Sequence, residues 1–312
     1  MTKVFIDGRS GTTGLRIYER IAERKDIQLI SLPEELRKDP AAKKEAFAKA
    51  DIAFLCLPDA AAIEAAQLAG EGTAVIDTST AHRTNDAWAY GFPELKGQKE
   101  KIASSKRIAN PGCHASGFIS LVAPLVQEGL IYKDAELTSF SVTGYSGGGK
   151  SMIADYEAES RIDLAEEGTI DPLDSPKQYV LTQKHKHLPE MQKVCGLTTA
   201  PVFCPIVADF YSGMTVTVPV FAKDLKGSPK DVEELYRSYY TGKLVRFESC
   251  PDGGVFGNAL AGRDDMIVTV SGNEERILLI SCFDNLGKGA SGAAIQNMNI
   301  LLGLPEETGL IL

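Results

Sequence analysis

Apolar residues in the first third of the chain alternate between two spacings. Short apolar runs rich in Val, Ile, Leu and Phe are typical of strands buried on both faces of a sheet, and the segments between them repeat apolar residues at helical intervals. Strands that alternate with helices predict a parallel sheet with right-handed crossovers. We expect strands at residues 3–7, 27–32, 52–58 and 74–79, and helices at 14–24, 40–50 and 60–69. The first helix is expected to bury Leu15, Tyr18, Ile21 and Ala22.

The pattern changes after residue 113. The apolar runs there are richer in β-branched residues, and two of them are joined at Gly272-Asn273, which predicts a hairpin and hence antiparallel pairing. The last apolar helix is closed by Gly303 and Pro305 and needs an apolar surface to pack on. We expect a helix at 115–126, strands at 137–144, 202–208, 214–221, 266–271 and 276–283, and a last helix at 289–303.

These elements predict an α/β protein with two domains. Residues 1–112 are expected to form a Rossmann-type dinucleotide-binding domain, and residues 113–285 an α+β catalytic and dimerisation domain with a mixed or antiparallel sheet. The chain is expected to return at 286–312 to pack on the first domain. Because an exposed apolar sheet face would be a liability, we expect a homodimer or homotetramer built through the second domain.

Composition narrows the function classes. The 312 residues suffice for two domains, and the net charge of −9 argues against a nucleic-acid or membrane-surface binder, both of which need a basic face. No apolar run approaches the roughly 20 residues of a membrane span, and no signal peptide is apparent. The six cysteines are scattered without a CxxC pair, which fits neither a disulfide framework nor a zinc site. We expect a soluble cytoplasmic protein without a metal.

A glycine-rich loop follows the first expected strand. "GRSGTTG" has the spacing GxxGxxG and opens an amphipathic helix, so its backbone could approach a pyrophosphate at the helix N-terminus. The alternative is a plain turn whose glycines serve packing. We place the cofactor contacts at the loop and at the ends of the second and third strands: Gly8, Arg9, Ser10, Gly11, Thr12, Thr13, Gly14, Ser31, Cys56 and Pro58.

The end of the second strand bears on the choice of cofactor. An NAD site usually carries a carboxylate about 20 residues after the loop, to hold the ribose hydroxyls. Here that position falls near Ser31, and no carboxylate follows until Glu34. Arg9 and Ser10 in the loop would favour a 2′-phosphate. The sequence therefore predicts NADP(H) as the cofactor.

"NPGCHASG" places Cys113 just behind Pro111-Gly112, at the start of an apolar helix. A helix N-terminus stabilises a thiolate, and its backbone N–H groups can form an oxyanion hole. Acyl-transfer chemistry needs both. The competing interpretation is a small apolar side chain that packs the helix start.

A thiol nucleophile also needs a proton carrier, and "HKHLPEM" supplies His185, His187 and Glu190. In an extended segment the two histidines would point the same way, toward one pocket. A metal site would lack a third convincing ligand, and a solvated loop with histidines by chance is the remaining alternative.

Three further loops carry polar groups. "TGYSGGGKS" offers Ser146, Gly147 and Lys150 for an anionic substrate, and "STAHRTND" offers Arg83. Asn285 and Lys288 in "NLGKGASG" open the last helix and are read as a second cofactor contact.

Taken in order, "GRSGTTG", "DTSTAHRT", "NPGCHASG", "TGYSGGGKS", "HKHLPEM" and "NLGKGASG" resemble the N-acetyl-γ-glutamyl-phosphate reductase family of arginine biosynthesis, in its shorter form. The long form carries an aromatic residue after the cysteine, where this chain has His114. Aspartate-β-semialdehyde dehydrogenase, a related family, shares the architecture and the catalytic cysteine.

The resemblance implies a mechanism. The Cys113 thiolate attacks the acyl phosphate, phosphate leaves a thioester, and hydride from NADPH gives a thiohemiacetal that collapses to the semialdehyde. His185 or His187 carries the proton, and Glu190 orients a histidine or the substrate. Arg83, Asn110, Ser146, Gly147 and Lys150 are the implied phosphate and carboxylate contacts.

Three other functions stay open at this point. An aspartate-β-semialdehyde dehydrogenase would run the same chemistry on another acyl phosphate. A thiol hydrolase using Cys113 and a histidine would not need the glycine loop. A redox sensor that binds NADPH and regulates a partner would tolerate the loss of Cys113.

Overall fold

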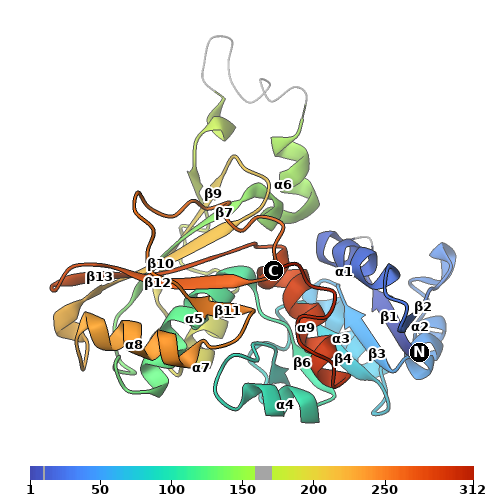
Figure 1. Ribbon diagram of the computed structural model, residues 1–312. Helices are drawn as coiled ribbons and strands as arrows, with labels where there is room; N and C mark the ends of the chain where they lie inside the picture. Colours follow the sequence, from blue (N-terminus) through green and yellow to red (C-terminus); the bar gives the residue numbers. More distant parts are fainter. Residues whose placement is uncertain (10, 159–170) are drawn as a thin grey trace. The chain divides into compact units, whose positions relative to one another are not determined.

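Two separate sheets organise the chain in the computed structural model, which describes residues 1–9, 11–158 and 171–312 (Figure 1). One compact unit comprises Met1–Gly112 and Ala290–Leu310, and the other Cys113–Gly289 and Ile311–Leu312. The first sheet is parallel throughout and the second is mixed. The fold class expected from the sequence is confirmed.

The first unit contains a six-stranded sheet in the order β2-β1-β3-β4-β6-β5. The chain adds β2 on one side of β1 and then β3 on the other side. The carboxyl ends of β1 and β3 therefore form the topological switch point at which open α/β sheets bind ligands. The strands are β1 (Thr2–Asp7), β2 (Ile27–Ile30), β3 (Ile52–Leu55), β4 (Ala74–Asp77), β5 (Ala89–Tyr90) and β6 (Arg107–Ala109).

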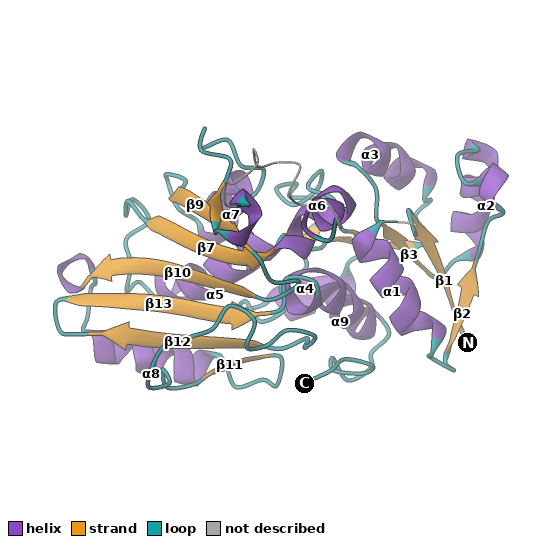
Figure 2. Cartoon of the chain, turned by 90° about the horizontal axis from the view of Figure 1, so that it is seen from above, coloured by secondary structure: helices purple, strands orange, loops and turns teal. Residues whose placement is uncertain are grey.

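Helices cover both faces of this sheet (Figure 2). Val4, Phe54 and Ile76 face α1, α4 and α9, whereas Phe5, Leu55 and Val75 face α2 and α3. Asp39 caps α2 by accepting a hydrogen bond from the Ala42 N–H at 2.7 Å. The helices are α1 (Thr12–Ala22), α2 (Pro40–Lys49), α3 (Asp59–Leu68), α4 (Gln98–Ser104) and α9 (Gly292–Leu301), with a 3₁₀ turn at Glu34–Leu36.

The buried face of α1 differs from the one expected. Ile17 and Ile21 are buried, whereas Leu15 is 45% exposed and Ala22 is also exposed. Gly14 faces inward because a Cβ there would lie 2.5 Å from the Gly8 carbonyl oxygen. Residues three and seven positions later share that face, so the glycine loop turns Ile17 inward and Leu15 outward.

The second unit contains a seven-stranded sheet in the order β11-β12-β13-β10-β7-β9-β8. The hairpin expected at Gly272-Asn273 is confirmed, since β12 and β13 pair antiparallel on either side of it. The pairs β7–β9 and β11–β12 are parallel. The strands are β7 (Thr138–Gly144), β8 (Lys177–Gln178), β9 (Val202–Ala208), β10 (Met214–Phe221), β11 (Val245–Phe247), β12 (Met266–Gly272) and β13 (Arg276–Phe283).

Among the described residues, the helices that pack on this second sheet lie on one of its faces. α5 is buried along most of its length against β10, β13, α7 and α8, and α8 begins at a capping box between Ser228 and Asp231. The helices are α5 (Cys113–Gln127), α6 (Gly149–Tyr156), α7 (Leu188–Cys195) and α8 (Pro229–Tyr239), with 3₁₀ turns at Tyr145–Gly148, Pro172–Asp174 and Ala222–Asp224 and a π-helical turn at Gly287–Ser291. Among the described residues, no helix has the length and apolar character needed to cross a membrane.

The other face of the second sheet is apolar and open. Strand pairing places Phe140, Val202, Phe221 and Leu278 on this one face, each between 39% and 55% exposed. An apolar face of this kind marks an interaction surface more often than a solvated one.

Candidate functional site

The glycine loop lies at the switch point of the first sheet. Gly8 directly follows β1 with a φ of +88°, and a Cβ on it would lie 2.2 Å from the backbone oxygen of Cys56, just after β3. Only glycine fits there, because both the left-handed conformation and the close approach exclude a side chain. The Gly11 N–H donates to the Gly8 oxygen at 3.1 Å, and α1 starts at the next residue.

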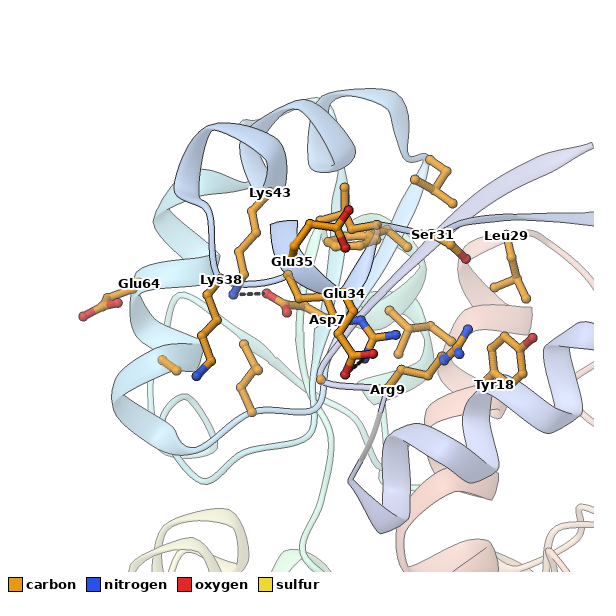
Figure 3. Close-up of a pocket in the computed structure, with 18 residues that line it drawn as sticks. Asp7, Arg9, Tyr18, Leu29, Ser31, Glu34, Glu35, Lys38, Lys43 and Glu64 are labelled. Carbon is orange, nitrogen blue, oxygen red and sulfur yellow. Dashed lines mark ion pairs between the residues drawn. The ribbon is translucent and has the colours of Figure 1, made fainter.

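A cavity of about 760 Å³ opens beside this loop, within the first unit (Figure 3). Arg9 and Ser31 line it, and the Arg9 guanidinium lies 4.2 Å from the centre of the Tyr18 ring. Ser31 stands directly after β2, where its side chain is exposed. This cation–π contact positions the Arg9 charge in the cavity beside the glycine loop.

Opposite charges line the rest of the cavity. The two carboxylates of Asp7 and Glu34 have cationic partners, since Lys43 lies 2.9 Å from Asp7 and Arg37 lies 3.6 Å from Glu34. Within the described part of the chain, neither Arg9 nor Lys38 takes part in an ion pair. A loop that admits a pyrophosphate, a hydroxyl at the end of β2 and these cations fit a phosphorylated dinucleotide.

The remaining residues assigned to the cofactor lie at several places in the chain. Thr12, Thr13 and Gly14 form the first turn of α1, and Pro58 precedes α3. Cys56 offers its backbone to the loop, while burial raises the pKa of its thiol to about 12. Ser10 lies outside the described residues. Two more, Asn285 and Lys288, lie in the second unit.

Those two residues are buried in the second unit. Asn285 donates to the Ser146 hydroxyl at 3.0 Å and accepts from the Gly213 N–H at 2.9 Å, so its amide joins two loops of that unit. Lys288 lies in the π-helical turn before α9. The structure thus places the residues assigned to the cofactor in two units.

Cys113 is the first residue of α5 and is half-buried. A Cβ on Gly289 would lie 2.9 Å from the Cβ of Cys113, so glycine lets the π-helical turn pack against the cysteine. In contrast, burial raises the pKa of the Cys195 thiol and raises that of Cys282 to about 11. Cys113 therefore differs from these buried thiols in its place at a helix N-terminus and in its partial exposure.

Three histidine rings lie close together in the second unit, and one of them, His114, directly follows Cys113 in the sequence. The ring of His114 lies 5.4 Å from that of His185 and 5.6 Å from that of His187, centre to centre, and the latter two rings are 4.7 Å apart. His114 is buried and bonded through both ring nitrogens, to Ser141 and Tyr179, each at 2.7 Å. Burial, with the nearby His185 and Lys186, lowers the pKa of His114 to about 3, so this ring is neutral.

The segment around His185 and His187 is not extended, which corrects the sequence expectation. His187 has helical dihedrals and caps α7, because Pro189 in the first turn favours a helix start. The two rings still meet. The His187 N–H donates to Nδ1 of His185 at 3.1 Å, which places the proton of a neutral His185 on Nε2. Glu190, also buried, follows His187 by three residues and so shares its side of α7.

The residues assigned to the substrate are divided between the units. Arg83 donates from Nε to the Asn110 oxygen and from an Nη to the Thr78 oxygen, both at 2.9 Å. The Asn110 side chain donates to the Ala290 oxygen at 3.1 Å. In the second unit, Ser146 and Gly147 lie in the 3₁₀ turn after β7, and Lys150 is exposed in the first turn of α6.

Sequence reasoning missed several residues of these sites. Lys38 and Lys43 reach the cavity from beyond β2, and the density of lysines there was a usable signal. Tyr179, which bonds His114, had no such signal, because a tyrosine in a polar segment does not indicate a contact with a histidine on a distant helix. Among the described residues, no group of three or more His, Cys, Asp and Glu side chains is arranged to hold a metal ion.

Comparison with known proteins defines the class first. The family model described as "Semialdehyde dehydrogenase, NAD binding domain" matches residues 32–105, and "Semialdehyde dehydrogenase, dimerisation domain" matches residues 113–285. The solved aspartate semialdehyde dehydrogenase from Francisella tularensis has a TM-score of 0.73 at 13% identity, covering 97% of this chain and 100% of the other. That from Candida albicans, solved with NADP, has a TM-score of 0.68 at 16% identity, covering 97% and 99%. The fold is that of the semialdehyde dehydrogenases.

Curated relatives then identify the family. The chain is 43% identical to the N-acetyl-gamma-glutamyl-phosphate reductase of Trichormus variabilis, with 99% of both chains covered. It is 45% identical to the enzyme of the same name from Brucella ovis, covering 96% of this chain and 99% of the relative. The chain belongs to the N-acetyl-gamma-glutamyl-phosphate reductase family.

Proposed function

We propose that this protein reduces N-acetyl-γ-glutamyl phosphate to N-acetylglutamate γ-semialdehyde and phosphate with NADPH, as a step of arginine biosynthesis. The observation that carries the proposal is full-length similarity of 43–45% to reductases of that name. The site supports it independently, because a half-buried thiol stands at a helix N-terminus directly before His114, whose ring lies close to those of His185 and His187.

Cys113 is the proposed nucleophile. Its thiolate attacks the carbonyl carbon of the acyl phosphate, the bond to the phosphate oxygen breaks, and a thioester remains on the sulfur. The N-terminus of α5 directs its backbone N–H groups and the positive end of the helix dipole toward the developing oxyanion, which we propose they stabilise. Lys150, exposed at the start of α6, is proposed to bind an anionic group of the substrate together with Ser146 and Gly147.

The histidine pair supplies the proton. NADPH, when bound, supplies hydride to the thioester carbon. The carbon–sulfur bond of the thiohemiacetal then breaks, and the proton movements pass through His185 or His187. Glu190 is proposed to orient the pair from the first turn of α7. Separate His185→Gln and His187→Gln variants identify the proton carrier as the one with the larger loss, about 10²- to 10⁴-fold in kcat.

We assign NADP(H) to the first unit, residues 1–112 with the returning segment near the C-terminus, and the acyl phosphate to the second. The cavity beside the glycine loop supports NADP(H), because Ser31 rather than a carboxylate ends β2 and Arg9 lies across from it. Arg83 and Asn110 are bonded to backbone oxygens, and we propose that they fix the strand end leading to Cys113 as well as contacting substrate.

The open face of the second sheet supports a homodimer or a dimer of dimers. Phe140, Val202, Phe221 and Leu278 would be covered by a second copy. Light scattering of the wild type and of Leu278→Lys tests this, and a monomeric wild type at micromolar concentration contradicts it. Six free cysteines suit a reducing compartment, so we place the enzyme in the cytoplasm.

The reverse reaction is the sharpest test of the whole proposal. Purified protein is given N-acetylglutamate γ-semialdehyde and NADP, with and without phosphate. We expect NADPH to form only with phosphate, because the thioester must be released as an acyl phosphate. Aspartate β-semialdehyde serves as the competing substrate, and faster turnover with it would assign the chain to the related activity instead.

A further inference from the structure

A chain of polar groups runs from β7 to the nucleophile helix in the second unit. Ser141 on β7 is bonded to Nδ1 of His114, and Nε2 of His114 is bonded to the Tyr179 hydroxyl, each at 2.7 Å. Ser141 and His114 are buried, and His114 is the residue after Cys113 on α5. None of the proposed catalytic steps uses these hydrogen bonds between Ser141, His114 and Tyr179.

The available protons determine which group donates in each of these two hydrogen bonds. The neutral His114 ring has one donor and one acceptor nitrogen. Over the residues that the structure describes, Ser141 Oγ has no hydrogen-bond partner other than His114, so a Ser141 hydroxyl that only accepted would leave its own proton buried and unbonded. Ser141 therefore donates to Nδ1, and Nε2–H donates to the oxygen of Tyr179. The Tyr179 proton is left pointing away from His114.

Cys113 directly precedes His114 on α5, and its thiolate lies within electrostatic range of the Tyr179 hydroxyl. We propose that the Tyr179 hydroxyl donates a hydrogen bond to the Cys113 thiolate and stabilises it before substrate binds. Burial and then the negative charge of Cys113 raise the pKa of Tyr179, so the phenol stays protonated and the two groups lie in electrostatic range. This role rests on Cys113 being the nucleophile of the proposed function.

The segment that carries Tyr179 is held firmly against β9. The Tyr179 N–H donates to the Pro205 oxygen at 3.2 Å, and the Gln183 side chain bonds both the N–H and the carbonyl of Phe203, at 2.9 and 2.8 Å. Val180 and Gln183 have φ values of +50° and +57°, which residues with side chains rarely adopt. Backbone strain of this kind persists where surrounding contacts enforce it and is frequent at functional sites.

Other titratable groups surround the pair and belong in the pH analysis. On the segment leading to α7 they are His185, Lys186 and His187, with Glu190 in its first turn. On the π-helical turn packed against Cys113 it is Lys288. Because all of them remain in a tyrosine variant, a shift caused by the hydroxyl alone can be separated from their titration.

The test is the pH dependence of iodoacetamide alkylation at Cys113, followed by mass spectrometry on the full-length wild type and on Tyr179→Phe. Only the thiolate reacts, so the midpoint of the rate against pH reports the stability of the thiolate. We expect Tyr179→Phe to raise the midpoint by about one pH unit. Tyr240→Phe is the matched control, since its hydroxyl donates to the Ser120 oxygen of α5 at 2.6 Å, two turns from Cys113.

An unchanged midpoint in Tyr179→Phe, or an equal shift in Tyr240→Phe, overturns the inference. Should Tyr179→Phe fail to fold, 3-fluorotyrosine at position 179 keeps the shape and makes the hydroxyl a stronger donor, so the midpoint must fall. A midpoint that stays or rises there is also contradictory. Alkylation needs no turnover, so an inactive Cys113→Ser tests the proposed function separately from this role of Tyr179.

Discussion

The two units build their candidate sites in opposite ways. In the first unit, the glycine loop and the residues around it come mainly from one stretch of chain, and the shape of the site is set mainly by backbone atoms. In the second unit, the site is a cluster of side chains from α5, β7, the segment after β8 and the start of α7. A backbone site is visible in a short motif, whereas a side-chain cluster appears only after the chain has folded.

The two sheets differ in the same sense. The first is covered on both faces, by α1, α4 and α9 on one and by α2 and α3 on the other. The second has helices on one face and leaves Phe140, Val202, Phe221 and Leu278 open on the other. The first sheet is covered on both faces by helices of its own chain, whereas the second leaves a face on which we propose that a second copy packs.

The largest effect is expected at Cys113, in the side-chain site. Cys113→Ser changes one atom, so a packing role predicts an active enzyme. The nucleophile role predicts a folded protein that binds NADPH and whose kcat falls by about 10³-fold or more, because a serine hydroxyl is a poor nucleophile without a strong base. Steady-state kinetics and NADPH fluorescence titration measure the two properties.

Cys250→Ser is the matched control, since Cys250 is also half-buried. It should retain full turnover. Labelling gives the same contrast, because Cys56, Cys195 and Cys282 have raised thiol pKa values and should react slowly with iodoacetamide, while substrate protects Cys113. Near-normal turnover in Cys113→Ser would end the thioester mechanism.

The backbone site should break at Gly8. Gly8→Ala puts a Cβ 2.2 Å from the Cys56 oxygen at a φ of +88°, so β1 and β3 must move apart at their ends. We expect NADPH affinity to fall at least tenfold and stability by about 2–4 kcal/mol. Gly11→Ala is the control for stability, because its φ is −74° and its nearest contact would be 3.6 Å away. Equal losses of stability in both variants would mean that the loop is not built around Gly8.

Sequence patterns predicted the elements better than the contacts. Both sheet types and the hairpin at Gly272-Asn273 followed from periodicity, because strand and helix spacing are local properties. The face of α1 was wrong, since Gly14 and not the apolar count sets which side turns inward. The extended segment at His185–His187 was wrong because the start of α7 there went unrecognised.

Some residues of the candidate site could be predicted from local sequence motifs, and others could not. Cys113 and the glycine loop were marked by local motifs, and their functional roles stay predictions. Tyr179 could not have been named, because its partner His114 lies 65 positions away in the chain and nothing local records that pairing. Gln183 was missed because its amide replaces a strand partner for β9, a role that no sequence spacing encodes.

A buried ion pair in the second unit should contribute more to the free energy of unfolding than a surface pair in the first. Burial would raise the pKa of Asp265, but hydrogen bonds from Arg263 and Arg246 outweigh it and hold that pKa below 3.8. A lowered pKa in the folded state stabilises the protein fully above about pH 5, and this stability is lost as pH falls through the folded value. Asp265→Asn should cost about 3 kcal/mol near neutral pH, measured by denaturant unfolding.

Glu45→Gln is the control for that variant, since Glu45 pairs with Lys49 on the exposed surface of α2. Solvent screens this pair, so its loss should leave the unfolding transition unchanged. The difference between Asp265→Asn and the wild type should shrink as pH falls from about 4 and vanish below the folded-state pKa of Asp265, where both proteins lack the charged carboxylate. A constant difference down to low pH would show that Asp265 acts through packing alone.

The smallest expected effect concerns the choice of cofactor in the first unit. We expect at least tenfold preference for NADP(H) over NAD(H), about 1.4 kcal/mol, because Arg9 lies over Tyr18 at the cavity and Ser31 ends β2. Arg9→Ala should weaken NADP(H) tenfold and leave NAD(H) unchanged, since the guanidinium is assigned to the 2′-phosphate alone. Ser31→Asp should act in the same direction, because a carboxylate repels the phosphate and accepts hydrogen bonds from ribose hydroxyls. Arg37→Ala removes an equal charge from the same cavity, but one paired with Glu34 at 3.6 Å, so it should change the preference much less. Equal kinetics of the wild type with both cofactors would contradict the assignment, and equal effects of Arg9→Ala and Arg37→Ala would reduce it to net charge.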